Sequence, residues 1–78
     1  TAEPVPLYAR REALRRQRHE LVADLARRTS RSHAEVNGQV NRVVGVTRVA
    51  DASVEQLERS VAVLLDELTA ASRRGRRG

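Results

Sequence analysis

Cysteine, methionine, tryptophan and phenylalanine are all absent from this chain of 78 residues, and Tyr8 is its one aromatic residue. Without cysteine the chain forms no disulfide bond and offers no thiolate for catalysis. Without large aromatic residues the core must be built from leucine, valine and alanine, and in a chain of this length that core is small. We therefore expect one small domain that is not an enzyme.

Lysine is absent as well. All 15 basic residues are arginine, and they face 10 acidic residues, which gives a net charge of +5 at pH 7. Arginine in place of lysine is typical of proteins from GC-rich genomes, while its forked guanidinium also suits contacts to phosphate and carboxylate groups. The positive excess favours nucleic acid or another acidic partner.

Long hydrophobic runs are missing too, so we expect no membrane-spanning segment and no membrane partner. The first six residues lack the basic and apolar stretches of a signal peptide, which predicts a cytoplasmic protein. Because the sequence does not begin with methionine, we expect it to be an excised piece of a longer protein.

Apolar residues recur at helical spacing in three stretches that are separated by short polar segments. Helices of these lengths, joined by short loops, indicate an all-α fold, a small three-helix bundle formed by residues 7–72. Before it, residues 1–6 contain two prolines and are predicted to be a linker, and residues 73–78 are predicted to be a flexible basic tail. The predicted helices run over 7–29, 33–44 and 54–72.

Each predicted loop ends in a capping pattern. Ser32 precedes Glu35 by three residues and Ser53 precedes Gln56 by three, a spacing at which the two residues exchange hydrogen bonds at a helix start. Gly45 is placed to end the second helix in the left-handed conformation. The predicted core comprises Leu14, Leu21, Leu25, Val36, Val40, Val44, Leu57, Val61, Leu64 and Leu68. The same apolar stripes contain Leu7, Val22, Val43, Val54 and Leu65, and Val46 and Val49 of the second loop are expected to reach the core.

The arginines are unevenly distributed along the chain. Residues 1–32 carry a net charge of +4, from eight arginines and four acids, and the tail carries another +4, whereas the third helix carries −3. Three acidic residues precede an arginine by four positions, so three local ion pairs are expected. These pairs are Glu12–Arg16, Asp24–Arg28 and Glu55–Arg59. The arginines predicted to contact nucleic acid are Arg10, Arg11, Arg15, Arg18, Arg27, Arg31, Arg42, Arg48, Arg73, Arg74, Arg76 and Arg77.

Two sets of polar residues have alternative roles. Arg11 and Arg18 flank the leucine stripe of the first helix, where their stems would either cover the rim of the core or form a ridge that faces phosphate groups. Asn37 and Asn41 are poor residues for the interior of a helix. Their amides would either bond the backbone of the 45–53 loop, which we expect for at least one of them, or contact a ligand.

The two histidines, His19 and His33, lie on different predicted helices, without a cysteine or a His-x3-His pair, so no metal site is expected. We expect His33 to be a half-buried packing or capping residue. Nothing marks a catalytic pocket, and no glycine-rich loop indicates a phosphate-bearing cofactor. The sequence thus predicts no catalytic residue, no cofactor and no small-molecule ligand.

The link between the first two helices has the spacing of a helix-turn-helix. The outward face of the second helix would then present Glu35, Gly38, Gln39 and Arg42, a short and partly acidic surface for reading a major groove. A single tyrosine also provides no platform for stacking single-stranded bases. Contact with nucleic acid should therefore be made mainly to backbone phosphates, with DNA preferred to RNA.

One stretch of the sequence combines two unusual elements. From His33 to Val46 it reads His-Ala-Glu-Val-Asn-Gly-Gln-Val-Asn-Arg-Val-Val-Gly-Val, and from Ala52 to Arg59 it reads Ala-Ser-Val-Glu-Gln-Leu-Glu-Arg. With the arginine-rich helix before it, this pattern resembles a helical module near the C-terminus of actinobacterial DEAD/DEAH-box (superfamily 2) helicases, over about residues 7–70. It is also similar to bacteriophage proteins of the antirepressor type. The helicase modules often end their third helix with tryptophan, which this chain lacks.

The resemblance implies an accessory, non-catalytic module that contacts nucleic acid or attaches a helicase to a partner, because the ATPase motifs of such helicases are not in this sequence. Two alternatives stay open. The chain would be a protein-interaction domain that docks on a partner or on its parent helicase core, for which Val63, opposite the leucine stripe, is the sequence indication. Otherwise it would be a small phage-like DNA-binding regulator.

Overall fold

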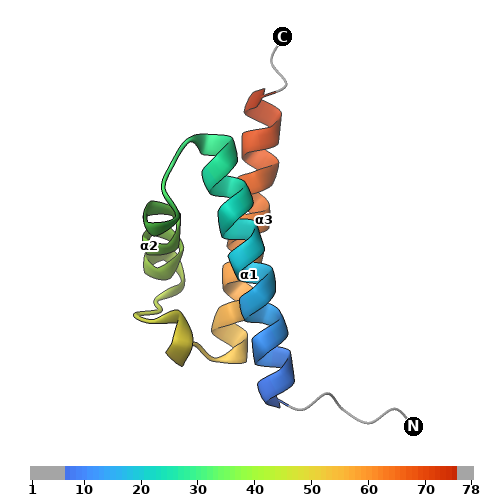
Figure 1. The fold of residues 1–78 in the computed structure, drawn as a ribbon, viewed down its shortest axis with the longest axis vertical. Helices are drawn as coiled ribbons and strands as arrows, with labels where there is room; N and C mark the ends of the chain where they lie inside the picture. The colour runs from blue at the N-terminus through green and yellow to red at the C-terminus, as the bar shows by residue number, and fades with distance from the viewer. Residues whose placement is uncertain (1–6, 76–78) are drawn as a thin grey trace, which may run out of the picture.

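The computed structural model describes residues 7–75, which form three long helices and one short 3-10 turn (Figure 1). The elements in chain order are α1 (Leu7–Thr29), α2 (His33–Val44), η1 (Val49–Asp51) and α3 (Val54–Gly75). The helices stand side by side, with α1 and α3 running in the same direction and α2 running against them (Figure 1). The prediction of an all-α three-helix bundle is confirmed, and residues 7–75 contain no strand.

The helix boundaries follow the predicted caps. The Glu35 amide donates to Ser32 Oγ at 3.1 Å and the Ser32 amide donates to Glu35 Oε1 at 2.9 Å, and Ser53 and Gln56 exchange the same two bonds at the same distances. Gly45 ends α2 with φ of 84°, and its amide donates to the Asn41 carbonyl at 2.8 Å. The left-handed backbone that Gly45 adopts is strained for residues with a Cβ, so glycine suits this turn.

The third helix is three residues longer than predicted, because it continues through Arg73 and Arg74 to Gly75. Arginine is a good helix former, and its charge is favourable beside the exposed carbonyls of a helix C-terminus. These two arginines therefore belong to the last turn of α3 instead of the predicted tail. Arg76 and Arg77, and the linker at 1–6, lie outside the described residues.

The core lies where the apolar faces of all three helices meet, and α1 and α3 share its longest seam. Val46 and Ala52 of the second loop are buried with it, and Val49 is partly buried, as predicted for the two valines. Of the predicted core, Leu14, Leu21 and Leu68 are only partly buried. The remaining members are buried, namely Leu25, Val36, Val40, Val44, Leu57, Val61 and Leu64.

Three stripe residues do not reach the core. Leu7 and Val43 are each 63% exposed and Leu65 is 48% exposed. Leu7 is the first residue of α1, and Val43 and Leu65 lie at the borders of their apolar stripes, so helical spacing does not ensure that a neighbouring helix covers them. Val63, predicted to lie opposite the stripe of α3, is instead partly buried against the core.

Candidate nucleic-acid interface

Arg18 is buried, which corrects its predicted position on the surface. Its side chain lies between α1 and α2, and the residue is only 3% exposed. It donates hydrogen bonds from Nη1 to Asn37 Oδ1 at 2.5 Å and from Nη2 to Asn41 Oδ1 at 2.7 Å. Desolvation by burial lowers the pKa of Arg18, although a guanidinium keeps its charge in proteins.

The same bonds settle the role of the two asparagines. Asn37 and Asn41 are one turn apart on α2, so both amide oxygens face the same guanidinium. The prediction that an amide would bond the 45–53 loop is wrong, because their partner is Arg18 on α1. A charged donor offers each amide a stronger hydrogen bond than a neutral backbone group does. Arg18 and the two asparagines therefore hold the register between α1 and α2 and take no part in an exposed site.

Most other arginines of α1 are held by neighbours in the fold. Arg10 forms an ion pair with Glu58 of α3, and Arg15 pairs with Glu12. Arg15 also donates from Nη2 to the carbonyl of Ala50 in η1 at 2.9 Å. The first half of α1 is in this way connected to α3 and to the second loop. A phosphate group that bound either arginine would have to compete with these bonds.

The second half of α1 is engaged in the same way. Arg27 and Arg28 share one carboxylate, Asp24, with N–O distances of 2.8 and 3.2 Å. Desolvation works to raise the pKa of Asp24, but the hydrogen bonds and charges of Arg28 and Arg27 outweigh it and lower this pKa. Arg31, in the link to α2, donates to the side chain of Gln39. Arg11 is half-buried, and its Nε has no hydrogen-bond acceptor among the described residues.

Only one of the three predicted local ion pairs forms, Asp24–Arg28. Glu12 pairs with Arg15 in place of Arg16, so that Arg16 is left exposed without a carboxylate. Arg59 is likewise exposed and makes no ion pair with Glu55 or with another described residue. Because the four-residue spacing predicts a local ion pair for each of these arginines, neither is part of the predicted interface.

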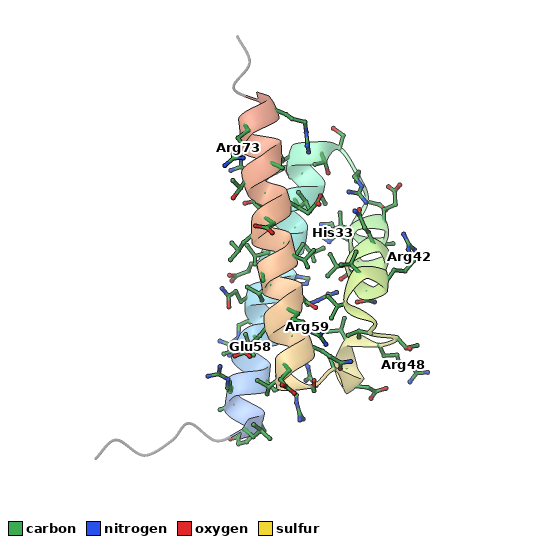
Figure 2. All side chains as sticks on the ribbon, turned by 180° about the vertical axis from the view of Figure 1, so that it is seen from behind. His33, Arg42, Arg48, Glu58, Arg59 and Arg73 are labelled. Carbon is green, nitrogen blue, oxygen red and sulfur yellow. The ribbon has the colours of Figure 1, made fainter. Side chains whose placement is uncertain are left out.

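The structure thereby separates the arginines into held and free ones. Within residues 7–75, the exposed arginines whose side chains make neither an ion pair nor a hydrogen bond are Arg16, Arg42, Arg48, Arg59, Arg73 and Arg74. We call these six the free arginines. Figure 2 labels four of them, on α2, on the second loop, on α3 and at the end of α3. The six come from α1, α2, the second loop and α3.

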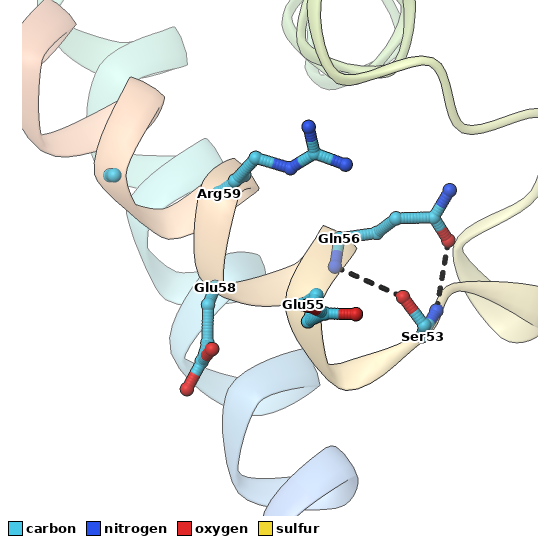
Figure 3. A pocket seen from close by; sticks show the side chains of 6 residues that line it. Ser53, Glu55, Gln56, Glu58 and Arg59 are labelled. Carbon is cyan, nitrogen blue, oxygen red and sulfur yellow. Dashed lines mark hydrogen bonds between the residues drawn. The ribbon is translucent and has the colours of Figure 1, made fainter.

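A hollow of about 850 Å³ lies on the surface at the start of α3 (Figure 3). It is lined by Ser53, Glu55, Gln56, Glu58, Arg59 and Ala62. Ser53 and Gln56 bond each other, whereas the guanidinium of Arg59 extends toward the side of the bundle where α2 lies (Figure 3). The hollow thus offers one free cation beside the carboxylate of Glu55.

The two histidines meet although they lie on different helices. The rings of His19 on α1 and His33 at the start of α2 have centroids 6.4 Å apart and planes at 79°. Both residues are exposed, so the half-buried position predicted for His33 is wrong. Residues 7–75 contain no group of three or more potential metal ligands.

Comparisons with known proteins identify no relative: no family model, no curated protein and no solved structure matches this chain. Among the described residues, no helix has the length and apolar character needed to cross a membrane.

Proposed function

We propose that this chain is a non-catalytic domain that binds the backbone of nucleic acid without sequence preference. The observation that carries the proposal is the set of six free arginines: their guanidinium groups are exposed and have no acceptor within the described residues. A guanidinium forms forked hydrogen bonds with phosphate oxygens, so each free arginine offers a phosphate contact without first losing a bond in the fold.

The distribution of the free arginines favours backbone contact over base recognition. They come from all three helices and from the second loop, and the three on α3 are divided between its first turns and its last turn. On α2, the predicted recognition helix, Arg42 is the only free arginine. Contacts to phosphate position a protein on a duplex but carry no sequence information.

The resemblance to the helicase module is consistent with this function. An accessory domain of a DNA helicase would hold the duplex near the motor without reading it, and the parent protein would supply ATP hydrolysis. We propose DNA in preference to RNA and a parent helicase core as the second contact. The protein-interaction alternative has lost its sequence indication, since Val63 packs against the core.

Binding can be measured by fluorescence anisotropy with duplex, forked and single-stranded DNA of one sequence at several salt concentrations. Each neutralised phosphate contributes about 0.9 to the salt slope for duplex DNA. The triple variant Arg42→Gln, Arg48→Gln, Arg59→Gln should bind duplexes of different sequence equally weakly and lower the slope by up to about 2.7. Deleting residues 73–78, which removes four arginines, should lower it by up to roughly 3–4.

The matched control removes three arginines that are exposed but held, Arg10, Arg27 and Arg28. It has the same net charge as the triple variant of free arginines, so long-range attraction falls equally in both. The proposal expects the control to keep the larger slope, with circular dichroism showing that both variants are folded. Equal slopes in the two triple variants, or no binding of the unmodified chain at low salt, would refute it.

A further inference from the structure

The contact between His19 and His33 is not used by the proposed function. These imidazoles come from two helices, and their centroids lie 6.4 Å apart. Both are exposed, and neither makes a hydrogen bond with another described side chain. Two imidazoles that face one another across a helix interface, each with free ring nitrogens, are a pair of potential metal ligands.

The backbone beneath the pair is braced. Arg18 precedes His19 and is bonded to Asn37, which lies one turn after His33. Arg18 also bonds Asn41, one turn further along α2. These two hydrogen bonds fix the relative position of α1 and α2 next to the histidines, so only the imidazole side chains need to adjust when a ligand binds.

We propose that His19 and His33 together bind one divalent transition-metal ion, with water completing its coordination. Zinc binds histidine nitrogen at about 2.0–2.1 Å, which places two imidazole centroids on one tetrahedral ion roughly 5 Å apart. The pair must therefore close by about 1 Å and turn its rings from the edge-to-face arrangement so that both point a nitrogen at the ion. Exposed side chains make such rotamer changes in picoseconds to nanoseconds.

The class of metal follows from the ligands. Imidazole suits zinc, nickel and copper, whereas magnesium and calcium require oxygen ligands. No third histidine, cysteine or carboxylate joins the pair among residues 7–75, so the site keeps open positions. The positive charges of Arg15, Arg16 and Arg18, which precede His19 on α1, oppose a cation. Glu12 pairs with Arg15 and the two asparagine oxygens bond Arg18, whereas Arg16 has no partner among the described residues. We therefore expect a weaker site than one with four protein ligands.

A metal held in this way would join α1 to α2. It binds the folded chain, in which the two imidazoles are adjacent, more tightly than the unfolded chain, in which they are 14 positions apart in sequence. Binding to the folded state alone stabilises it in proportion to the logarithm of metal concentration. A bound metal would thus strengthen the attachment of α2 to α1.

The test is thermal unfolding of the full chain at pH 7.5 with zinc, nickel or magnesium. At ten times the dissociation constant, zinc or nickel should raise Tm by about 6–11 °C and magnesium should leave it unchanged. His19→Gln and His33→Gln should each abolish most of the shift, while Glu20→Gln, an exposed change beside His19, should keep it.

Calorimetry should show one metal per chain, with a Tm shift that does not depend on protein concentration. Because both histidines are exposed, the glutamine variants should be as folded as the parent without metal. A shift that survives in either single variant, or one that grows with protein concentration because metal bridges two chains, would overturn the site. So would the absence of any shift with zinc and nickel.

Discussion

The hydrogen bonds of Arg18 permit a sharp test, because removing its acceptors and removing its charge should have different costs. Changing Asn37 and Asn41 to alanine leaves a guanidinium that is 3% exposed without the two bonds it makes in the fold. Breaking a buried charged interaction from one side costs about 3–5 kcal/mol. Arg18→Met keeps a long side chain in place and leaves two half-exposed amides that can bond water, so we expect a cost of about 1–2 kcal/mol.

The decisive comparison is the double alanine change made in the Arg18→Met background. With no charge to satisfy there, the two changes together should cost less than about 1 kcal/mol. A chain of this length has a total stability of roughly 4–12 kcal/mol, so all of these differences are measurable by urea unfolding followed by circular dichroism. Arg16→Met, an exposed neighbour without a partner, is the control and should change stability by about 0.5 kcal/mol or less. If the double alanine change costs the same stability with arginine and with methionine at position 18, the hydrogen bonds of Arg18 do not account for the contribution of the two asparagines.

Two further predictions concern the core and a helix cap. Leu64 is fully buried, so Leu64→Ala should lower the free energy of unfolding by about 2–5 kcal/mol. Leu65 is next to it but 48% exposed, so Leu65→Ala should lower it by about 0.5 kcal/mol or less. Similar losses of stability for the two variants in urea unfolding would contradict the core assignment. Hydrogen bonds from the backbone and hydroxyl of Ser32 lower the pKa of Glu35, so this carboxylate stabilises the fold above the pKa of an unfolded glutamate and loses that effect as the pH falls through the lowered value. Between pH 6 and pH 3 the parent should therefore lose more stability than Glu35→Gln, which keeps the bond without titrating; parallel losses would refute the assignment.

The helices could be predicted because their signals are local. A serine with glutamate or glutamine three positions later forms hydrogen bonds with the free amides at the start of a helix. Gly45 ends α2 in the left-handed conformation. Both signals act within a few residues and do not depend on the rest of the fold. The third helix exceeded its prediction because two arginines before Gly75 were assigned to the tail on account of the glycines around them. Their own helix propensity decided the outcome.

The candidate interface was harder to predict because it depends on which arginines find a partner across the fold. Helical spacing correctly placed Arg18 beside the leucine stripe, but its burial required the amide oxygens of another helix, 19 and 23 positions away. Arg10 pairs with Glu58, which is 48 positions away in the sequence. Glu12 pairs with Arg15, although the four-residue spacing predicted a pair with Arg16. Local ion pairs on a helix contribute only about 0.2–0.5 kcal/mol, so tertiary contacts readily override them. The composition therefore predicts an acidic partner, and the three-dimensional pairing of the side chains decides which arginines are free to contact it.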